Sequence, residues 1–343
     1  MKPILTAALI ALSAPLAAQE ATTNFGSGPT VLTLRSTTDI AIIAPVLEAF
    51  IEDNADVSVH YEQWGSNALY EASKEACLTD TSPADAVFSS AVHQMLDLVN
   101  MACATRYVSD LTTALPPSRR WRDELWGLTE EPAVMAYNTD LVDVSEVPHS
   151  RFELLDLMRQ NPTKYRGHIA TYDIEASGLG YLYAFNDSLE ATTFGALLEG
   201  FARADAVATC CSAEIINDVA SGRFLIAYNV LGSYVQNATA TNVGVILPED
   251  YTLFLSRAYM IPANATHPTE AARLLDFILS PKGQRIVKQM GLVFPDDRSE
   301  TGLLPSARRF IPLRPPLLVA LDHHAKEQFI SQWRDAFAAP PIP

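Results

Sequence analysis

Short apolar runs alternate along the chain with segments whose apolar residues recur at helical spacing. Residues 31–34 form a β-rich run, a polar turn follows, and apolar residues then recur at helical spacing as far as Ile51. The same order is repeated further on, with strands expected at 57–61, 84–88, 166–172 and 223–228. Repeated units of strand, turn and helix predict an α/β chain with mostly parallel sheets.

Two longer apolar segments, 131–137 and 251–261, flank a middle block of ordinary domain size. If both segments cross between domains, the first domain is discontinuous and includes the last part of the chain. We therefore expect one lobe built from residues 24–133 and 258–343, and a second lobe built from residues 134–257.

The N-terminal residues have the order of a secretory signal peptide. Lys2 precedes the apolar run 4–12, and small residues come just before Gln19. We expect residues 1–18 to be a cleavable signal peptide, with a disordered or amphipathic N-terminus as the alternative. If the chain is exported, we expect it in the periplasm. No later stretch reaches the roughly 18 uncharged apolar residues of a membrane span.

The charge balance excludes one large class of partner. The 343 residues include 40 acidic and 24 basic side chains, for a net charge of -16, while 48% of the residues are hydrophobic. A chain of this size and apolar content can bury about two cores of ordinary size. Its negative charge repels nucleic acid and anionic membrane surfaces, so we expect neither as a partner.

Four cysteines follow the expected signal peptide, and in an oxidising compartment they allow three pairings. We favour a disulfide between Cys77 and Cys103. Cys210 and Cys211 are neighbours in sequence, where a disulfide is strained, so two buried thiols are an equally good interpretation. The absence of CxxC spacing argues against a zinc site and a thioredoxin-type redox role.

Polar turns follow the expected strands, where ligands bind in open parallel sheets. Each hydroxyl taken alone is best explained as a helix N-cap. Ser89 and Ser90 are adjacent, however, and one of them suffices as a cap, which leaves the other free to meet a ligand.

The sequence contains none of the common enzyme motifs. There is no GxSxG elbow, Walker loop or HExxH, and the segment 178–180 lacks the third glycine of a dinucleotide loop. His323 and His324, near Glu327, are better explained as a solvated helix face than as a metal site. We expect no catalytic residue, cofactor or bound metal. His93 is expected to be structural, and Trp64 and Trp126 could stack on a sugar ring or belong to the core.

Several segments together resemble the extracellular solute-binding proteins of ATP-binding-cassette (ABC) importers. These are "VLTLRSTTDIAIIAPVLEAF", "ADAVFSSAVHQMLDLVN", "EEPAVMAYNTDLV", "ATYDIEASGLGYLY", "IAYNVLGSYV" and "YTLFLSRAYMIP", spread from about Thr30 to about Met290. Within that family the chain is similar to the ferric-type group, especially the branch of hexose-phosphate and phosphoglycerate binding proteins. The resemblance implies a periplasmic binding protein type II fold, with two α/β lobes joined by two crossover strands and a ligand cleft that closes by a hinge.

Carried over position by position, the resemblance also implies the residues that line the cleft: Ser36, Thr37, Thr38, Ser66, Ser89, Ser90, Ser177, Gly178, Tyr181, Asn229, Gly232 and Ser233. It implies a monomer that captures a small phosphorylated or polyhydroxy anion in the periplasm and delivers it to an ABC permease in the inner membrane.

Two departures leave other ligands and partners open. Ferric members of the family bind iron through an adjacent tyrosine pair, whereas Tyr181 and Tyr183 are two residues apart, roughly 200° around a helix. Related proteins commonly carry an acidic residue where His93 stands. A ferric iron binding protein of an ABC importer, or a ligand-sensing partner of a membrane histidine kinase, are therefore the alternatives.

Overall fold

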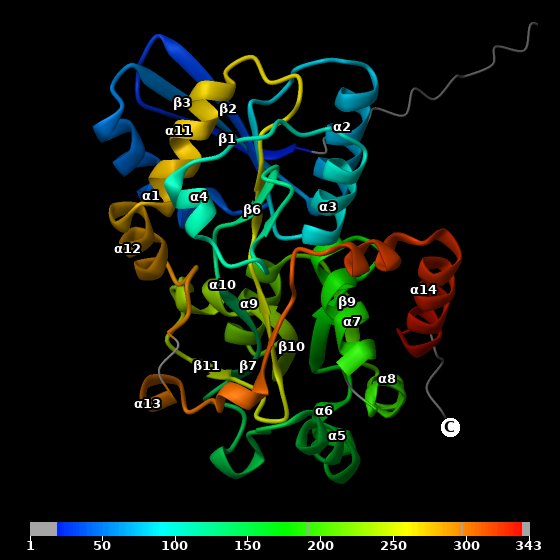
Figure 1. The fold of residues 1–343 in the computed structure, drawn as a ribbon. Coiled ribbons are helices and arrows are strands. Elements are labelled where there is room, and N and C mark those ends of the chain that lie inside the picture. Colours follow the sequence, from blue (N-terminus) through cyan, green and yellow to red (C-terminus); the bar gives the residue numbers. More distant parts are fainter. Residues whose placement is uncertain (1–18, 191, 296–297, 338–343) are drawn as a thin grey trace, which may run out of the picture.

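The computed structural model describes residues 19–190, 192–295 and 298–337, so the expected signal peptide at 1–18 lies outside the described residues. Two lobes, each built on its own seven-stranded sheet, lie one above the other in Figure 1. Within the described part of the chain, no helix is long and apolar enough to span a membrane.

Lobe 1 is built on a mixed sheet. Its strands follow the order β1 (Gln19–Phe25), β3 (Val57–Trp64), β2 (Thr30–Ser36), β4 (Ala86–Ser89), β13 (Ala258–Met260), β6 (Leu125–Gly127) and β5 (Arg120–Trp121). Its helices are α1 (Ile40–Asp53), α2 (Ser66–Leu78), α3 (Val92–Asn100), α4 (Asp110–Ala114), α11 (Pro268–Leu279) and α12 (Pro281–Gln289).

Lobe 2 is built on the second sheet. Its strands follow the order β14 (Arg308–Phe310), β12 (Thr252–Leu255), β7 (Glu131–Asn138), β10 (Ile226–Leu231), β8 (Ile169–Tyr172) and β9 (Val207–Thr209), and β11 (Val243–Ile246) also pairs with β7. Its helical segments are η1 (Val144–Glu146), α5 (Arg151–Gln160), α6 (Pro162–Tyr165), α7 (Gly178–Glu190), α8 (Phe194–Arg203), α9 (Ser212–Ala220), α10 (Gly232–Gln236), α13 (Arg298–Thr301) and η2 (Pro305–Ala307).

The sheets are mixed rather than mostly parallel, which corrects the sequence-based expectation. Strands β3, β2 and β4 pair in parallel, as do β10, β8 and β9. Strand β13, by contrast, enters lobe 1 directly from lobe 2 and pairs antiparallel with β4 and β6. A strand that arrives without a crossover helix runs opposite to its neighbours, and the apolar pattern carries no sign of that direction.

The helices cover the sheets because each presents one apolar face. On α1 the buried side chains are Ile42, Ile43, Val46, Leu47 and Phe50, a spacing that places all of them on one side of the helix. The central strand β4 is buried along its whole length. A disulfide joins Cys77, near the end of α2, to Cys103, just after α3, with 5.5 Å between the two Cα atoms.

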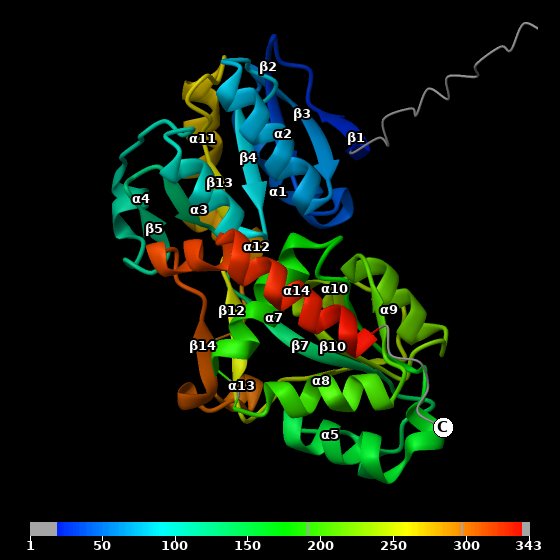
Figure 2. The same cartoon turned by 90° about the vertical axis from the view of Figure 1, so that its right-hand side faces the viewer.

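The last part of the chain departs from the expected assignment of residues 258–343 to lobe 1. Strand β14 pairs in parallel with β12 of lobe 2. The chain then passes α3 of lobe 1 as η3 (Pro315–Leu321), and α14 (His323–Phe337) packs on α8 of lobe 2, as Figure 2 shows. Aromatic contacts hold α14 there, with Phe329 stacked on Phe194 and Phe337 close to Phe201.

Two of the segments that carry the chain between the lobes are short: 128–130, between β6 and β7, and 256–257, between β12 and β13. They bond to each other, because Leu128 donates its N–H to the carbonyl of Arg257 (2.9 Å) and Arg257 donates its N–H to Thr129 Oγ1 (2.8 Å). These two crossings are therefore side by side. The stretch after α12 also leads from lobe 1 to lobe 2, and it bonds to the first crossing, because Glu130 donates its N–H to the carbonyl of Leu292 and accepts the N–H of Phe294 (both 2.8 Å).

A buried ion pair lies at this junction. Arg257 Nε and Glu131 Oε1 are 2.7 Å apart, and both side chains are 0% exposed. Arg257 also donates to Thr38 Oγ1 of lobe 1 (2.9 Å), and Ser233 of lobe 2 donates to Glu131. Burial disfavours the charged guanidinium, but the Glu131 carboxylate, together with the phenols of Tyr234 and Tyr183, outweighs burial and raises the pKa of Arg257 above its ordinary value.

Removing one partner of this pair should destabilise the whole protein. Glu131→Gln leaves the Arg257 charge buried without a counter-charge, which costs about 3 to 5 kcal/mol of unfolding free energy. Urea unfolding of the variant and the unchanged protein measures the difference. Asp53→Asn, which breaks the half-exposed pair of Asp53 with Lys282, is the control and should cost at most about 1 kcal/mol. Equal losses for the two variants would contradict the role given to the buried pair.

Candidate functional site

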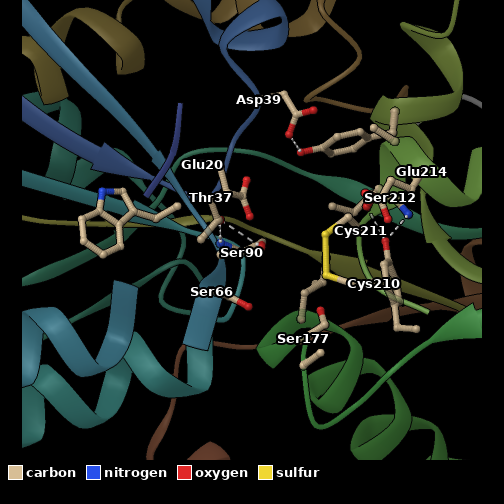
Figure 3. A pocket seen from close by; sticks show the side chains of 18 of the residues that line it. Glu20, Thr37, Asp39, Ser66, Ser90, Ser177, Cys210, Cys211, Ser212 and Glu214 are labelled. Carbon is tan, nitrogen blue, oxygen red and sulfur yellow. Dashed lines mark hydrogen bonds between the residues drawn. A yellow bond between two sulfur atoms is a disulfide. The ribbon is translucent and has the colours of Figure 1, made fainter. Parts of the chain in front are cut away.

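A cavity of about 410 Å³ lies between the two lobes. Lobe 1 contributes the residues Glu20, Thr37, Asp39, Gln63, Trp64, Gly65, Ser66 and Ser90 to its lining. Lobe 2 contributes Tyr172, Ala176, Ser177, Leu179, Cys210, Cys211, Ser212, Ala213, Glu214, Leu231 and Tyr234. Figure 3 shows the polar side chains of both lobes facing this space.

The cavity lies where strands end and helices begin. Helices α1, α2 and α3 follow β2, β3 and β4 in lobe 1, and α7 and α9 follow β8 and β9 in lobe 2. The first turn of each helix leaves backbone N–H groups without an intrahelical partner and carries the positive end of the helix dipole. Ser66, Ser90, Ser177 and Ser212 of the lining lie at or just before these helix starts.

Four of the hydroxyl residues expected from the sequence line the cavity: Thr37, Ser66, Ser90 and Ser177. Thr37 Oγ1 and Ser90 Oγ are 3.1 Å apart, and Thr37 Oγ1 also accepts the N–H of Ser90 (2.9 Å). Ser66 Oγ accepts the N–H of Gly178 (2.9 Å), across the space between the lobes. Ser177 Oγ accepts the N–H of Gly180 (3.0 Å), as an N-cap of α7 does.

The two adjacent serines have different surroundings. Ser89 is buried, lies outside the lining and accepts the N–H of Ala91 through its Oγ (3.2 Å). Ser90 lines the cavity beside Thr37. Both serines are buried, so they differ in that the Ser89 hydroxyl supports the turn into α3, whereas the Ser90 hydroxyl lies at the cavity wall, paired with Thr37.

Seven further residues expected in the cleft lie outside the cavity lining: Ser36, Thr38, Gly178, Tyr181, Asn229, Gly232 and Ser233. Ser36 Oγ accepts the N–H of Thr38 (3.0 Å), and Thr38 and Ser233 bond to the buried ion pair at the crossing. Their hydroxyls therefore support the turn and the junction between the lobes.

Of the other four residues, Tyr181, Asn229 and Gly232 support lobe 2, and Gly178 lies at the contact between the lobes. Tyr181 donates to the carbonyl of Ala320 (2.7 Å), which fastens η3, and Asn229 donates to the buried Asp187. Gly178 and Gly232 provide close packing. A Cβ at Gly178 would come within 2.8 Å of Gln94, and one at Gly232 within 3.0 Å of Pro132.

His93 of α3 is a structural residue. Its side chain is 0% exposed, and its ring lies 5.7 Å from the ring of Tyr181. Burial lowers the pKa of His93 to about 3, with a smaller contribution from Lys326, so the imidazole is neutral at physiological pH.

Several lining residues were not predicted from the sequence patterns. Glu20 and Asp39 are examples: Glu20 Oε2 accepts from Gln63 Nε2 (3.0 Å), and Asp39 Oδ1 accepts from the Tyr234 hydroxyl (2.7 Å). The remaining ones are Gln63, Gly65, Tyr172, Ala176, Leu179, Cys210, Cys211, Ser212, Ala213, Glu214, Leu231 and Tyr234. Asp39 closes the turn "STTD", and this position at a helix start was the available clue.

The electrostatics of the lining are acidic. The carboxylates of Glu20, Asp39 and Glu214 line the cavity, and its lining includes no lysine or arginine. Burial raises the pKa of Tyr172 to about 12, so this phenol stays neutral and pairs with Ser212 Oγ (2.5 Å). Because the lining has no basic side chain, the helix dipoles that begin beside the cavity are the sources of positive potential next to it.

The described residues contain one group of three or more histidine, cysteine or acidic side chains with ligand atoms within 4.8 Å of one another. It consists of His323, His324 and Glu327, all exposed on α14 and outside the cavity. The three cavity carboxylates do not form such a group in this conformation.

The lobes touch directly beside the cavity. Asn67 Nδ2 on α2 donates to the carbonyls of Glu175 (2.8 Å) and Ala176 (3.1 Å) in the turn before α7. The bond between Tyr234 and Asp39 and the bond from the Gly178 N–H to Ser66 also join lobe 2 to lobe 1. These contacts hold the lobes together around the cavity.

Comparison with known proteins identifies a family that the chain matches. A family model described as bacterial extracellular solute-binding protein matches residues 81–313. No curated protein sequence matches the chain. Among solved structures, the substrate binding protein of an ABC transporter from Agrobacterium tumefaciens is similar, with a TM-score of 0.86 and 28% identity over 92% of this chain and 98% of that one.

Two more distant structures share the fold. AfuA of Actinobacillus pleuropneumoniae, a periplasmic binding protein with exogenous fructose-6-phosphate bound, matches with a TM-score of 0.70 and 14% identity over 91% of this chain and 100% of that one. Iron-bound HitA of Pseudomonas aeruginosa matches with a TM-score of 0.67 and 19% identity over 90% and 99%. At these identities the likeness shows the fold alone.

The contact made by Asn67 predicts a shift in the opening of the cleft. Asn67→Ala removes both bonds to the turn before α7, so the ligand-free protein should open more, with a loss of about 1 kcal/mol for the closed arrangement. Small-angle X-ray scattering should show a larger radius of gyration. Ser73→Ala on the same helix, whose hydroxyl donates only to Leu69 of α2, should leave it unchanged. Identical scattering for Asn67→Ala and the unchanged protein would show that the contact does not hold the lobes.

Proposed function

The chain belongs to the bacterial extracellular solute-binding protein family, and we propose that it captures a small polyhydroxylated anion, of the sugar-phosphate type, for an ABC importer. Proteins of this family serve transport rather than catalysis, and they deliver small solutes to a membrane permease. Closure of the two lobes around the solute selects the form that a permease binds. The family has a periplasmic location, and we extend the proposal to residues 1–18 as its signal peptide and to a monomer.

The composition of the cavity lining is the observation that supports this ligand class. Hydroxyl groups of Thr37, Ser66, Ser90 and Ser177 can both donate and accept hydrogen bonds. The carboxylates of Glu20, Asp39 and Glu214 offer acceptor oxygens, so they suit the hydroxyl groups of a sugar or polyol. A solute with several hydroxyl groups can satisfy both kinds of partner at once.

The helix starts favour a small anionic group on that solute. The starts of α1, α2, α3, α7 and α9, or the turns just before them, all contribute residues to the lining, and the four hydroxyls lie there. Backbone N–H groups in this arrangement bind phosphate without basic side chains. Since three carboxylates oppose negative charge, a single anionic group fits the cavity better than a multiply phosphorylated one.

Ferric iron remains the second candidate, because carboxylates and the phenols of Tyr172 and Tyr234 line the cavity. Against it, both phenols bond to protein partners, Tyr172 with Ser212 and Tyr234 with Asp39. Iron binding would need these bonds to break and the carboxylates to converge.

Thermal unfolding against matched solutes tests the ligand class. The panel contains hexose phosphates, their parent hexoses, inorganic phosphate, phosphoglycerate, simple carboxylates and ferric citrate. A solute present at about 100 times its dissociation constant adds about 2.7 kcal/mol to the stability of the folded state. We expect a hexose phosphate to raise the midpoint more than its parent hexose or inorganic phosphate. A rise with ferric citrate alone would contradict the proposal and favour iron.

The two serines provide a sharper test of the site. Ser90→Ala removes a cavity hydroxyl and should weaken the best sugar phosphate about tenfold, as expected for one lost hydrogen bond to a charged group. Ser89→Ala, its neighbour outside the lining, should lower the unfolding midpoint and change affinity far less. Isothermal titration calorimetry gives both affinities. Equal losses of affinity would show that Ser90 acts on the fold and not on the solute.

A further inference from the structure

A disulfide between neighbouring residues forms part of the cavity wall. Cys210 and Cys211 are bonded to each other between β9 and α9, and both line the cavity. In Figure 3 this disulfide lies on the lobe 2 side, across from Ser66 and Ser90 of lobe 1. It therefore faces the space that the proposed solute occupies.

This bond does little for the stability of the chain as a whole. A disulfide stabilises a fold mainly by closing a loop of the unfolded chain, and the gain grows with loop length. Cys77 and Cys103 are 26 residues apart, whereas Cys210 and Cys211 are adjacent. The Cys210–Cys211 disulfide is therefore expected to act on its immediate surroundings and not on the overall stability.

The backbone at this position is unusual. Cys211 has φ +74° and ψ +120°, in a region that residues other than glycine rarely adopt, and it is the N-cap residue of α9. Such conformations gather at ligand sites, where the surrounding structure maintains them. Ser212 and Glu214 follow at once and line the same cavity, so the conformation of Cys211 sets where their side chains point.

The sulfur atoms add to an apolar part of the cavity lining. Lobe 2 also contributes Ala176, Leu179, Ala213 and Leu231 to that lining, and the hydroxyls of Ser66 and Ser90 in lobe 1 lie across from the disulfide. Sulfur is soft and polarisable and packs well against C–H groups. A sugar ring has a polar rim and apolar C–H faces. A lining with hydroxyls on one side and an apolar surface on the other therefore suits a sugar ring.

We propose that the Cys210–Cys211 disulfide is a specificity-determining element of the site, whose sulfur surface contacts the C–H face of the bound solute and whose ring positions Ser212 and Glu214. The proposal rests on the proposed function, since it assumes a polyhydroxylated solute in this cavity. Tight binding then requires the intact S–S bond.

Selective reduction is the first test, in the Cys77→Ala/Cys103→Ala background so that a single disulfide remains. Tris(2-carboxyethyl)phosphine supplies two electrons, water supplies the oxygen that the phosphine gains, and two protons complete the two thiols. We expect the affinity for the best hexose phosphate of the panel to fall at least tenfold on reduction and to return on reoxidation. Affinities within twofold of each other before and after reduction would overturn the proposal.

Substitutions test the sulfur surface and the backbone separately. Cys210→Ala/Cys211→Gly removes the sulfurs while glycine allows the positive φ, and Cys210→Ser/Cys211→Ser removes the bond while keeping similar size. Both should bind the hexose phosphate at least tenfold more weakly. The control, Cys77→Ala/Cys103→Ala, should lower the unfolding midpoint and keep the affinity within twofold. Normal affinity in either Cys210/Cys211 variant would exclude contact by the disulfide.

A failure of the proposed function can be told apart from a failure of this proposal. If no hexose phosphate binds, the ligand class is wrong, and the same oxidised and reduced proteins are titrated with whichever panel solute does bind. A further measurement needs no ligand. Alkylation and mass spectrometry during reduction of the folded, unsubstituted protein give the order in which the two disulfides open. Cys210–Cys211, at the cavity wall, should open before Cys77–Cys103, of which Cys103 is 3% exposed. The reverse order, or free Cys210 and Cys211 thiols in protein exported to the periplasm, would overturn the proposal.

Discussion

The ion pair between Arg257 and Glu131 is the interaction on which the two-lobed arrangement depends. Both side chains are 0% exposed, and each belongs to a different crossing between the lobes. A buried charge is tolerated only when its partners are in place, so the two crossings must stay together. Through Thr38 and Ser233 the same pair holds one turn of each lobe, which fixes the base of the cleft while its walls remain free to approach each other.

The cavity follows from the direction of the strands. Parallel strands in each lobe end at the cleft, so the helices that follow them begin there and bring N–H groups and small polar side chains from both sides. The chain carries a net charge of -16 and lines the cavity with three carboxylates and no basic side chain. Any affinity for an anion must therefore come from hydroxyls and N–H groups, which are directional and act at short range. Such a site discriminates by the positions of hydroxyl groups more than by charge.

The sequence patterns anticipated the parts of this structure that depend on local order. The run at 31–34 lies within β2, and the turns after three lobe 1 strands do supply Thr37, Ser66 and Ser90 to the cavity. What the patterns missed depends on contacts between distant residues. Thr38 and Ser233 look like cavity hydroxyls in sequence, but they bond to an ion pair that forms only when both crossings meet. Strand β14, with the sequence Arg-Arg-Phe, has no apolar alternation and is a strand only because β12 pairs with it.

A crystal structure of the protein with a hexose phosphate bound would show whether the cavity between the lobes holds a polyhydroxylated anion. We expect the phosphoryl group among Thr37, Ser66, Ser90 and Ser177, the sugar hydroxyls against the carboxylates, and a C–H face against Cys210–Cys211. A phosphoryl group beside Glu214, or a solute bound only outside the cleft, would contradict it.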